Sequence, residues 1–272
     1  MTPRSGTWRL IDTGPLDGPA NMALDESLLT CFDPANSRPV LRLYGWAPPS
    51  FSVGKFQRAA GVLHLEKCAV EGIAVVRRIT GGGCIFHADE LTYSIICAPE
   101  HIDGISGVKE SYRRLCGFLL LAYRKLSLSP SFAVDSSPQG TRHGQRTPLC
   151  FAGREEYDIT VKGRKLGGNA QRRARGIIFQ HGSIPLRGSL SRISPFLRVE
   201  PPSPDQWAVS LSDLMPDVEE SLIKSCLVSS FEEHLGIRLS ACVPSDAENE
   251  QAAILLKRKY LSAAWNLGME EL

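Results

Sequence analysis

The sequence predicts an α/β protein, with a main domain of alternating strands and helices followed by a small helical region. Short apolar runs typical of strands alternate with amphipathic segments as far as residue 200, and from Pro201 onward the pattern changes to helices. The 272 residues are enough for one large α/β domain, or for one domain with a small addition. We therefore expect a main domain over residues 1–200 and a helical C-terminal region over residues 201–272, packed on it.

Strands and helices alternate in the first half of the chain. Strands are recognised as apolar or alternating runs, and helices as segments whose apolar residues recur about every 3.6 positions. In chain order we expect a strand at 8–11, a helix that starts near Gly18, strands at 39–46 and 51–54, a helix at 61–71, and strands at 73–76 and 90–97. The first of these helices is expected to bury Met22, Leu28 and Leu29.

The second half adds a long helix, a hairpin and the C-terminal helices. Apolar residues recur at the helical repeat across residues 106–127, with Ser106 as the expected N-cap, and residues 135–148 have the composition of a surface loop. Residues 157–161 alternate apolar and polar, and a Lys-Gly turn then returns the chain as a hairpin. A strand at 176–184, helices within 210–235 and a capping box before a last helix complete the prediction.

Composition excludes several classes of protein. The net charge of +2 argues against a dedicated nucleic-acid binder, and the longest apolar run is too short to span a bilayer. The N-terminal residues contain no apolar segment typical of a secretory signal, so we expect a cytoplasmic protein whose eight cysteines are reduced thiols. No two cysteines form a C-x-x-C pair, which makes zinc binding and dithiol redox chemistry poor hypotheses, and we expect no metal site.

The first candidate site is the segment RRITGGGCIFH, from Arg77 to His87. Gly81, Gly82 and Gly83 allow a close backbone approach and positive φ angles, their N–H groups can bind an anion, and Arg77 and Arg78 add positive charge. A flexible turn is the alternative interpretation. The segment is neither a Walker A loop nor a G-x-G-x-x-G motif.

The second candidate is Lys165 with the small residues that follow it. On a continuous strand, Lys165 shares one face with Gly167, Asn169 and Gln171, while Gly168 and Ala170 lie on the other face. A lysine above a floor of glycine leaves room for an elongated ligand. The alternative is a solvated lysine on an edge hairpin, which is the usual environment of this residue.

The third candidate is Cys150. Pro148 and Gly153 flank this cysteine, so it is expected in a loop rather than in a core strand. A thiolate nucleophile needs a neighbouring base or cation, and Lys165 is a candidate cation. The alternative is a small buried hydrophobe, the usual role of a lone cysteine in a cytosolic protein.

Together these segments resemble the lipoate ligase and octanoyltransferase family. The Arg77–His87 segment resembles the family signature R-R-x-[ST]-G-G-G-x-x-x-H, and residues 163–171, GRKLGGNAQ, resemble G-[RK]-K-[IVL]-[AG]-G-[SN]-A-Q. The segments NMALDE at 21–26 and QHGSI at 180–184 are also similar to family motifs. The matches are in the family's order, from about residue 8 to residue 190.

The resemblance implies the fold shared with biotin ligases, a mixed sheet with flanking helices that binds an acyl chain beside the glycine-rich loop. It implies a catalytic domain over residues 1–200, with substrate bound by Arg77, Arg78, Gly81, Gly82, Gly83, His87, Gly167, Gly168, Asn169 and Ala170. The implied protein partners are octanoyl-acyl carrier protein and apo lipoyl domains, such as glycine cleavage H protein or 2-oxoacid dehydrogenase E2. We expect neither a nucleic acid nor a membrane as a partner.

Two mechanisms divide this family. Ligases activate free lipoate with ATP and usually carry G-R-N-D ahead of the lysine hairpin, whereas one class of octanoyltransferase carries a pattern like C-F-x-x-P-S-x-Y-E-[IVL] there. The present chain reads CFAGREEYDI from Cys150 and lacks G-R-N-D, with GREE from Gly153 in place of the usual Pro-Ser region. The resemblance therefore implies an octanoyltransferase with Cys150 as the nucleophile and no cofactor.

In that mechanism Lys165 keeps Cys150 ionised and binds the acyl carbonyl, and His87 is expected to pack rather than to transfer protons. Arginines 77, 78, 172, 173 and 175 either steer acidic carrier proteins or form an ordinary solvated basic patch. Three alternatives stay open. They are an ATP- and magnesium-dependent lipoate ligase, an amidotransferase that moves acyl groups between lipoyl domains, and a non-enzymatic binding module.

Overall fold

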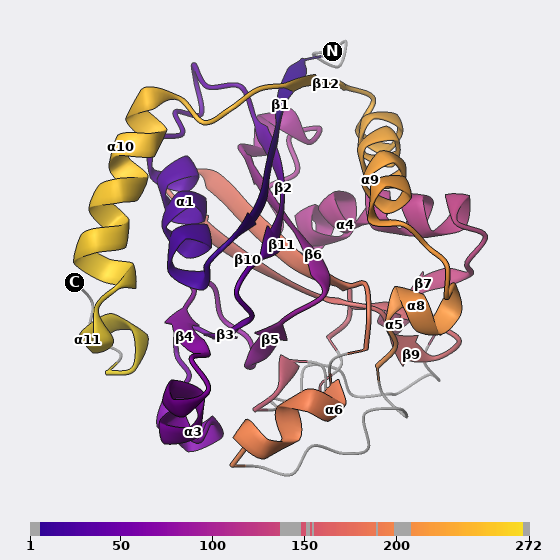
Figure 1. Ribbon diagram of the computed structural model, residues 1–272. Helices are drawn as coiled ribbons and strands as arrows, with labels where there is room; N and C mark the ends of the chain where they lie inside the picture. Colours follow the sequence, from indigo (N-terminus) through magenta and orange to yellow (C-terminus); the bar gives the residue numbers. More distant parts are fainter. Residues whose placement is uncertain are drawn as a thin grey trace.

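The computed structural model describes residues 6–136, 148–150, 153, 155–188, 190–198 and 208–268. Its centre is a six-stranded mixed sheet with the strand order β10-β11-β6-β2-β1-β12 (Figure 1). These strands are β1 (Thr7–Leu16), β2 (Val40–Trp46), β6 (Glu90–Cys97), β10 (Gly168–Ala174), β11 (Ile177–Pro185) and β12 (Arg238–Ala241). Strand β1 is parallel to β2 and β12, and the remaining neighbours are antiparallel.

Two three-stranded sheets complete the β-structure. One has the order β4-β3-β5, formed by β3 (Ser50–Val53), β4 (Ala74–Arg77) and β5 (Ile85–His87). The other has the order β7-β8-β9, formed by β7 (Pro130–Phe132), β8 (Ile159–Val161) and β9 (Arg164–Lys165). The β8–β9 turn has positive φ at both Lys162 and Gly163, which confirms the predicted hairpin.

Helices cover both faces of the large sheet. Figure 1 shows α1 (Gly18–Thr30) beside α10 (Asp246–Leu255) on one side of the sheet, and α4 (Val108–Lys125) beside α9 (Glu220–Leu235) on the other. The shorter helices are α2 (Ala59–Val62), α3 (Leu65–Val70), α5 (Ala133–Ser136), α6 (Leu190–Ile193), α8 (Leu211–Leu214) and α11 (Ala263–Asn266). Single helical turns lie at Pro99–His101, Ser194–Phe196 and Leu256–Tyr260, the last of them a π turn.

Alternating side chains on the strands feed the two cores. Leu41 of β2 packs with the helices α4 and α9, whereas its neighbour Val40 packs with α1, because successive side chains of a strand point to opposite faces. The helix predicted near Gly18 forms with Met22, Leu28 and Leu29 buried, as expected. Its N-cap is Asp17, whose carboxylate accepts the Ala20 N–H at 2.7 Å.

The C-terminal region is less purely helical than predicted. Its strand β12 pairs with β1 and forms one edge of the large sheet, and the predicted boundary near residue 200 lies outside the described residues. The capping box at Ser245 is confirmed, but the last helix is interrupted by the π turn before α11. The helix predicted at 61–71 forms as two short helices, and α4 has Gly107 rather than Ser106 at its N-cap.

Most of the surface loop predicted at 135–148 lies outside the described residues. In the part of the chain that is described, no helix combines the length and the apolar character needed to cross a bilayer.

Candidate active site

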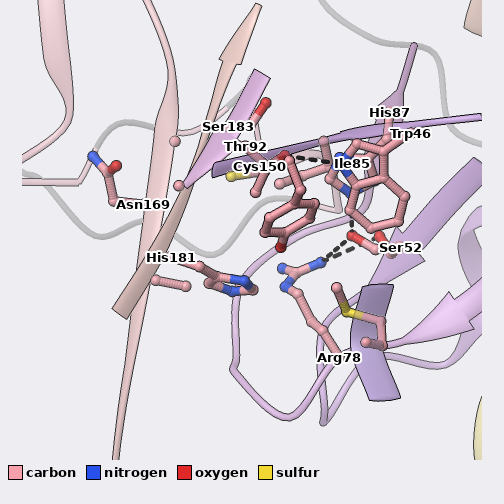
Figure 2. Close-up of a pocket in the computed structure, with 16 residues that line it drawn as sticks. Trp46, Ser52, Arg78, Ile85, His87, Thr92, Cys150, Asn169, His181 and Ser183 are labelled. Atoms are coloured by element: carbon pink, nitrogen blue, oxygen red, sulfur yellow. Dashed lines mark hydrogen bonds between the residues drawn. The ribbon is translucent and has the colours of Figure 1, made fainter. Parts of the chain in front are cut away.

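A pocket lies where the large sheet meets the β4-β3-β5 sheet, and Figure 2 shows Cys150, Arg78, His87 and His181 around it. It contains about 410 Å³ of empty space, part of it open to solvent. The residues that line it are Met22, Tyr44, Trp46, Ser52, Arg78, Gly82, Ile85, His87, Thr92, Cys150, Gly168, Asn169, Ala170, His181, Gly182 and Ser183. The pocket therefore brings together the glycine-rich segment, the cysteine and the residues after Lys165, which are far apart in the sequence.

Cys150 is half-buried on the pocket wall, in a short segment held against the glycine-rich segment. The Cys84 N–H donates to the Pro148 carbonyl at 2.9 Å, and the Cys150 N–H donates to the Cys84 carbonyl at 3.1 Å. The side chain of Leu149, the residue between Pro148 and Cys150, is buried in the core beside the β4-β3-β5 sheet. This backbone pairing fixes where the Cys150 side chain enters the pocket.

Lys165 is buried beneath the Cys150 segment. Its Nζ atom lies 2.7 Å from Asp158 Oδ2 and donates to the carbonyls of Cys150 at 2.8 Å and Gly153 at 3.1 Å. Burial lowers the pKa of the Lys165 ammonium, but the charges of Asp158 and Cys150 outweigh burial, and the net shift is upward. Lys165 is therefore a charged, hydrogen-bonded anchor of the segment that carries Cys150.

The predicted strand face after Lys165 is wrong. Strand β9 ends at Lys165 and β10 begins at Gly168, because Gly167 has a φ of +146° that interrupts the strand. A Cβ on Gly168 would lie 2.8 Å from Cys150 Sγ and 3.7 Å from Lys165 Nζ, so Gly168 rather than Gly167 faces both groups.

Of the four residues from Gly167 to Ala170 that were predicted to bind substrate, three line the pocket, namely Gly168, Asn169 and Ala170. Asn169 also accepts a hydrogen bond at 2.7 Å from the hydroxyl of Tyr93. Gly167 is not among the described residues that line the pocket. A Cβ at this position would lie 2.5 Å from the carbonyl oxygen of Ser183, so its role is to allow the turn.

Arg78 connects the triple-glycine loop to the pocket. Its guanidinium donates to the carbonyls of Gly81 at 2.9 Å and Gly83 at 2.7 Å, and to the hydroxyl of Ser52 at 3.1 Å. Burial lowers the Arg78 pKa, although the neighbouring Cys150 opposes that shift. Of the three glycines, Gly82 lines the pocket with a φ of +101°. Arg78 is thus a buried cation that shapes the loop and faces the same pocket as Cys150.

Arg77 points away from the pocket. Its guanidinium donates to five backbone carbonyls at 2.7–3.1 Å, three in residues 54–57 and two at Trp265 and Asn266. The structure therefore does not bring Arg77 to the candidate substrate site, but uses it to hold the α11 segment against β4. Because Arg77 and Arg78 are 0% and 2% exposed, the idea that they form part of a surface patch is wrong.

His87 lines the pocket, and each of its ring nitrogens has a partner. Nε2 lies 2.7 Å from the Ser52 hydroxyl, and Nδ1 lies 2.7 Å from Glu90 Oε1. The ring stacks on Trp46, with 3.7 Å between the centroids and 10° between the planes. These contacts agree with the expected packing role of His87.

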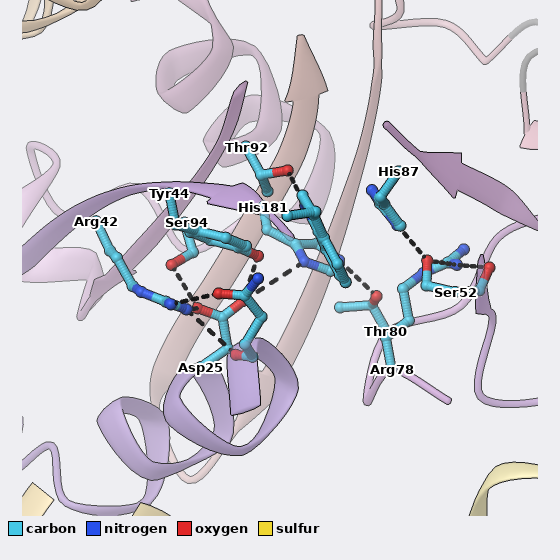
Figure 3. Close-up of polar contacts among 12 residues, drawn as sticks. Asp25, Arg42, Tyr44, Ser52, Arg78, Thr80, His87, Thr92, Ser94 and His181 are labelled. Atoms are coloured by element: carbon cyan, nitrogen blue, oxygen red, sulfur yellow. Dashed lines mark hydrogen bonds and ion pairs between the residues drawn. The ribbon is translucent and has the colours of Figure 1, made fainter. Parts of the chain in front are cut away.

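A polar network behind the pocket was not predicted as part of the site (Figure 3). Asp25 forms a buried ion pair with Arg42 at 2.7 Å and accepts a hydrogen bond from the Tyr44 hydroxyl at 2.8 Å. His181 lies in the pocket wall, 2.7 Å from the Thr80 hydroxyl and 3.9 Å from Asp25. Burial, and then the charges of Arg78 and His87, hold the pKa of His181 well below its usual value.

Sequence signals for this network existed. Asp25 and His181 belong to the NMALDE and QHGSI segments, which resemble family motifs. The partner of Lys165, Asp158, was also missed as a site residue. Asp158 occupies the acidic position of the pattern C-F-x-x-P-S-x-Y-E-[IVL], which was a signal for it, but its contact with Lys165 forms only when the hairpin closes.

The basic cluster near the β10–β11 turn is divided among different contacts. Arg173 donates to the carbonyls of Ser106 and Gly107 and thereby fixes the start of α4, while Arg172 donates to the Ile79 carbonyl at 3.2 Å. Arg175 is exposed. Residues 172 and 175 border a second surface cavity, which Glu26 and Asp33 also line.

The sequence model described as the lipoyl protein ligase A/B catalytic domain matches residues 17–235. Octanoyltransferase LipM of Halalkalibacterium halodurans is 35% identical over 272 aligned positions, with 96% of this chain and 98% of that protein covered. The proteins of the same name from Kyrpidia tusciae and Bacillus subtilis are 36% and 34% identical, each with 96% of this chain and 98% of the relative covered.

Solved structures of ligases share the fold. A lipoate-protein ligase A crystallised with ATP superposes with a TM-score of 0.83 at 23% identity, covering 97% of this chain and 100% of that chain. A bipartite lipoate protein ligase from Thermoplasma acidophilum superposes with a TM-score of 0.80 at 22% identity, covering 98% of both chains. At this identity the likeness concerns the fold alone. The family match and the full-length relatives together show that the chain belongs to the lipoyl protein ligase A/B catalytic domain family.

Proposed function

We propose that this protein transfers an octanoyl group from octanoyl-acyl carrier protein to the target lysine of an apo lipoyl domain, through an acyl-enzyme on Cys150. The observation that carries the proposal is the position of Cys150 on the pocket wall, directly above the buried Lys165–Asp158 ion pair. Relatives that align with nearly the whole chain are named octanoyltransferase, which supports the same reaction.

In the first half-reaction, Cys150 Sγ attacks the carbonyl carbon of the donor thioester as a thiolate. A new carbon–sulfur bond forms to Cys150, and the bond to the carrier's sulfur breaks, so the carrier leaves as a thiolate with the electron pair. The octanoyl chain lies in the pocket against Tyr44, Trp46 and Ile85, which supply apolar surface.

In the second half-reaction, the lysine amine of the lipoyl domain attacks the carbonyl carbon of octanoyl-Cys150. An amide bond forms, the Cys150 sulfur leaves with the electron pair, and the amine loses one proton, which restores the free thiol. The two protein substrates therefore occupy the enzyme in turn, and a single pocket serves both.

Negative charge that develops on the thioester oxygen is stabilised by Arg78. Its guanidinium is buried in the wall of the pocket that Cys150 also lines, and buried charges interact strongly because water does not screen them. Lys165 acts mainly through its charge and through the carbonyls it holds, since Asp158, Cys150 and Gly153 already bind its ammonium group.

The donor thioester supplies the free energy for amide formation, so this route needs neither ATP nor magnesium. An ATP-dependent ligase is the second candidate, favoured only by the fold shared with the solved ligases. Transfer with free octanoate and ATP, and none from octanoyl-acyl carrier protein, would establish the ligase instead. An amidotransferase would accept an octanoylated lipoyl domain as the donor in the same assay.

We place the reaction in the cytoplasm, where acyl carrier protein and reduced thiols are expected together. Octanoylation of an apo lipoyl domain is followed by intact-protein mass spectrometry, with glycine cleavage H protein and a 2-oxoacid dehydrogenase E2 lipoyl domain as parallel acceptors. Modification of at least one of them from octanoyl-acyl carrier protein alone is the expected result.

A further inference from the structure

Outside the pocket, the buried carboxylate of Asp158 binds Lys165, and Lys165 in turn holds the Cys150 segment. Asp158 precedes β8, and its side chain and that of Lys165 are each 1% exposed. Asp158 Oδ2 lies 2.7 Å from Lys165 Nζ and also accepts the Glu155 N–H at 2.7 Å. The Asp158 carbonyl accepts the Ala133 N–H at 2.9 Å, which ties the residue to the end of β7.

We propose that Asp158 is a positioning residue for the nucleophile, acting on Cys150 through the Lys165 ammonium rather than on substrate. This inference rests on the proposed function of Cys150. Among the described residues that line the pocket Asp158 is absent, so it is placed to orient the segment and not to contact the acyl group.

The arrangement depends on the number of N–H bonds that Lys165 carries. The ammonium form has three, and Asp158 and the carbonyls of Cys150 and Gly153 are among their partners. A buried lysine without a counter-charge tends to lose its proton, and a neutral amine has only two N–H bonds. Removing the Asp158 charge therefore weakens the hold of Lys165 on the carbonyl of Cys150.

The hold on that carbonyl matters because it adds a second attachment to the one that the Cys150 N–H makes with Cys84. The Cys150 N–H donates to the carbonyl of Cys84, the residue before β5, so the N-terminal side of Cys150 is fixed to the β4-β3-β5 sheet. Its carbonyl is fixed by Lys165, and Lys165 is held in turn by Asp158. Nucleophile placement errors of about 1 Å reduce rates by about a hundredfold, so a modest loosening is measurable.

The first test is Asp158→Asn, which keeps the size of the side chain and removes its charge. Single-turnover formation of octanoyl-Cys150 is expected to fall about tenfold or more in maximal rate, with a donor concentration for half-maximal rate within about twofold of wild type. The matched control is Glu248→Gln, which removes the charge from the ion pair between Glu248 and Arg9. Neither of these two residues lines the pocket. The control is expected to acylate as wild type does.

A second measurement reports position rather than activity. Amide hydrogen exchange of the peptide that contains Cys150 is expected to accelerate in Asp158→Asn and to stay unchanged in Glu248→Gln, since the Cys150 N–H pairs with Cys84. Asp158→Asn protein that acylates at the wild-type maximal rate, or protects this peptide as wild type does, overturns the proposal.

A double-mutant cycle with Lys165→Met tests whether Asp158 acts through Lys165. If it does, the acylation rate of Asp158→Asn/Lys165→Met lies within about twofold of the rate of Lys165→Met alone. The proposal is overturned if the loss of rate in the double variant, as a free energy, equals the sum of the losses in the two single variants. Removing both charges also avoids an unpaired buried ion, so the double variant serves if Asp158→Asn does not fold. Its Cys150 peptide must then exchange faster than in wild type. Absence of an octanoyl adduct on wild-type protein is a separate outcome, because it contradicts the proposed function itself.

Discussion

The Sγ atom of Cys150 lies 2.8 Å from the position that a Cβ atom would take on Gly168. The same position is 3.7 Å from Lys165 Nζ, so the first residue of β10 leaves space for both groups. Real Cβ atoms do not approach a neighbour this closely, and a side chain at residue 168 therefore displaces the thiol. This contact links the small residues after the lysine hairpin directly to the candidate nucleophile.

Gly168→Ala is expected to slow formation of octanoyl-Cys150 by about tenfold or more while the protein stays folded, because the methyl group moves Sγ from its place in the pocket. Single-turnover acylation measures the rate, and circular dichroism monitors folding. Gly61→Ala is the control, because a Cβ there meets its nearest atom, in Arg58, at 3.8 Å. Equal acylation by the two variants would mean that Gly168 does not position the thiol.

Arg78→Lys is expected to reduce acylation by about a hundredfold, since a single ammonium cannot hold the carbonyls of Gly81 and Gly83 and the Ser52 hydroxyl in the planar arrangement of a guanidinium. The maximal single-turnover rate should fall. Wild-type rates in a folded Arg78→Lys protein would contradict a role for this cation in the reaction.

The expected effect of Arg77→Met differs from that of Arg78→Lys. It leaves five backbone carbonyls without the guanidinium and releases the α11 segment, so the free energy of unfolding should fall by about 3 kcal/mol. Denaturant unfolding measures this loss. Acylation per folded molecule should remain near wild type, and a selective loss of acylation with unchanged stability would return Arg77 to the substrate site.

His181 makes stability depend on pH. Its folded-state pKa is held well below the ordinary value of 6.5, chiefly by burial, so below that pH the unfolded chain binds a proton that the folded protein excludes. The contribution of His181 to the free energy of unfolding is present in full above pH 6.5. It falls as the pH decreases below 6.5, by up to about 1.4 kcal/mol per pH unit. Unfolding of His181→Gln between pH 5 and 7 should show a smaller slope than wild type, and equal slopes would exclude this effect.

The sequence predicted local features best. The helix α1 begins at Gly18, the Lys162-Gly163 turn closes the hairpin, and the capping box at Ser245 starts α10, because each depends on residues within a few positions of one another. The strand β12 escaped prediction because only four residues form it, and its partner β1 lies at the other end of the chain.

The site was predicted in part. Cys150, Arg78, His87 and the residues from Gly168 line one pocket, as the family resemblance implied. The different positions of Arg77 and Arg78 could not be predicted. Arg77 ends β4 and Arg78 follows it, and nothing in the sequence says which of the two side chains points to the pocket. Asp158 was missed for a similar reason, since its partner Lys165 is reached only when the hairpin closes.

The most direct test of the central claim is intact-protein mass spectrometry after brief mixing of the wild-type protein with octanoyl-acyl carrier protein, without ATP or acceptor. We predict a mass increase of one octanoyl group that maps to the peptide containing Cys150, disappears on addition of an apo lipoyl domain, and is absent from Cys150→Ala. Full transfer activity in Cys150→Ala, or modification of the lipoyl domain only when ATP and free octanoate are supplied, would contradict the acyl-enzyme mechanism.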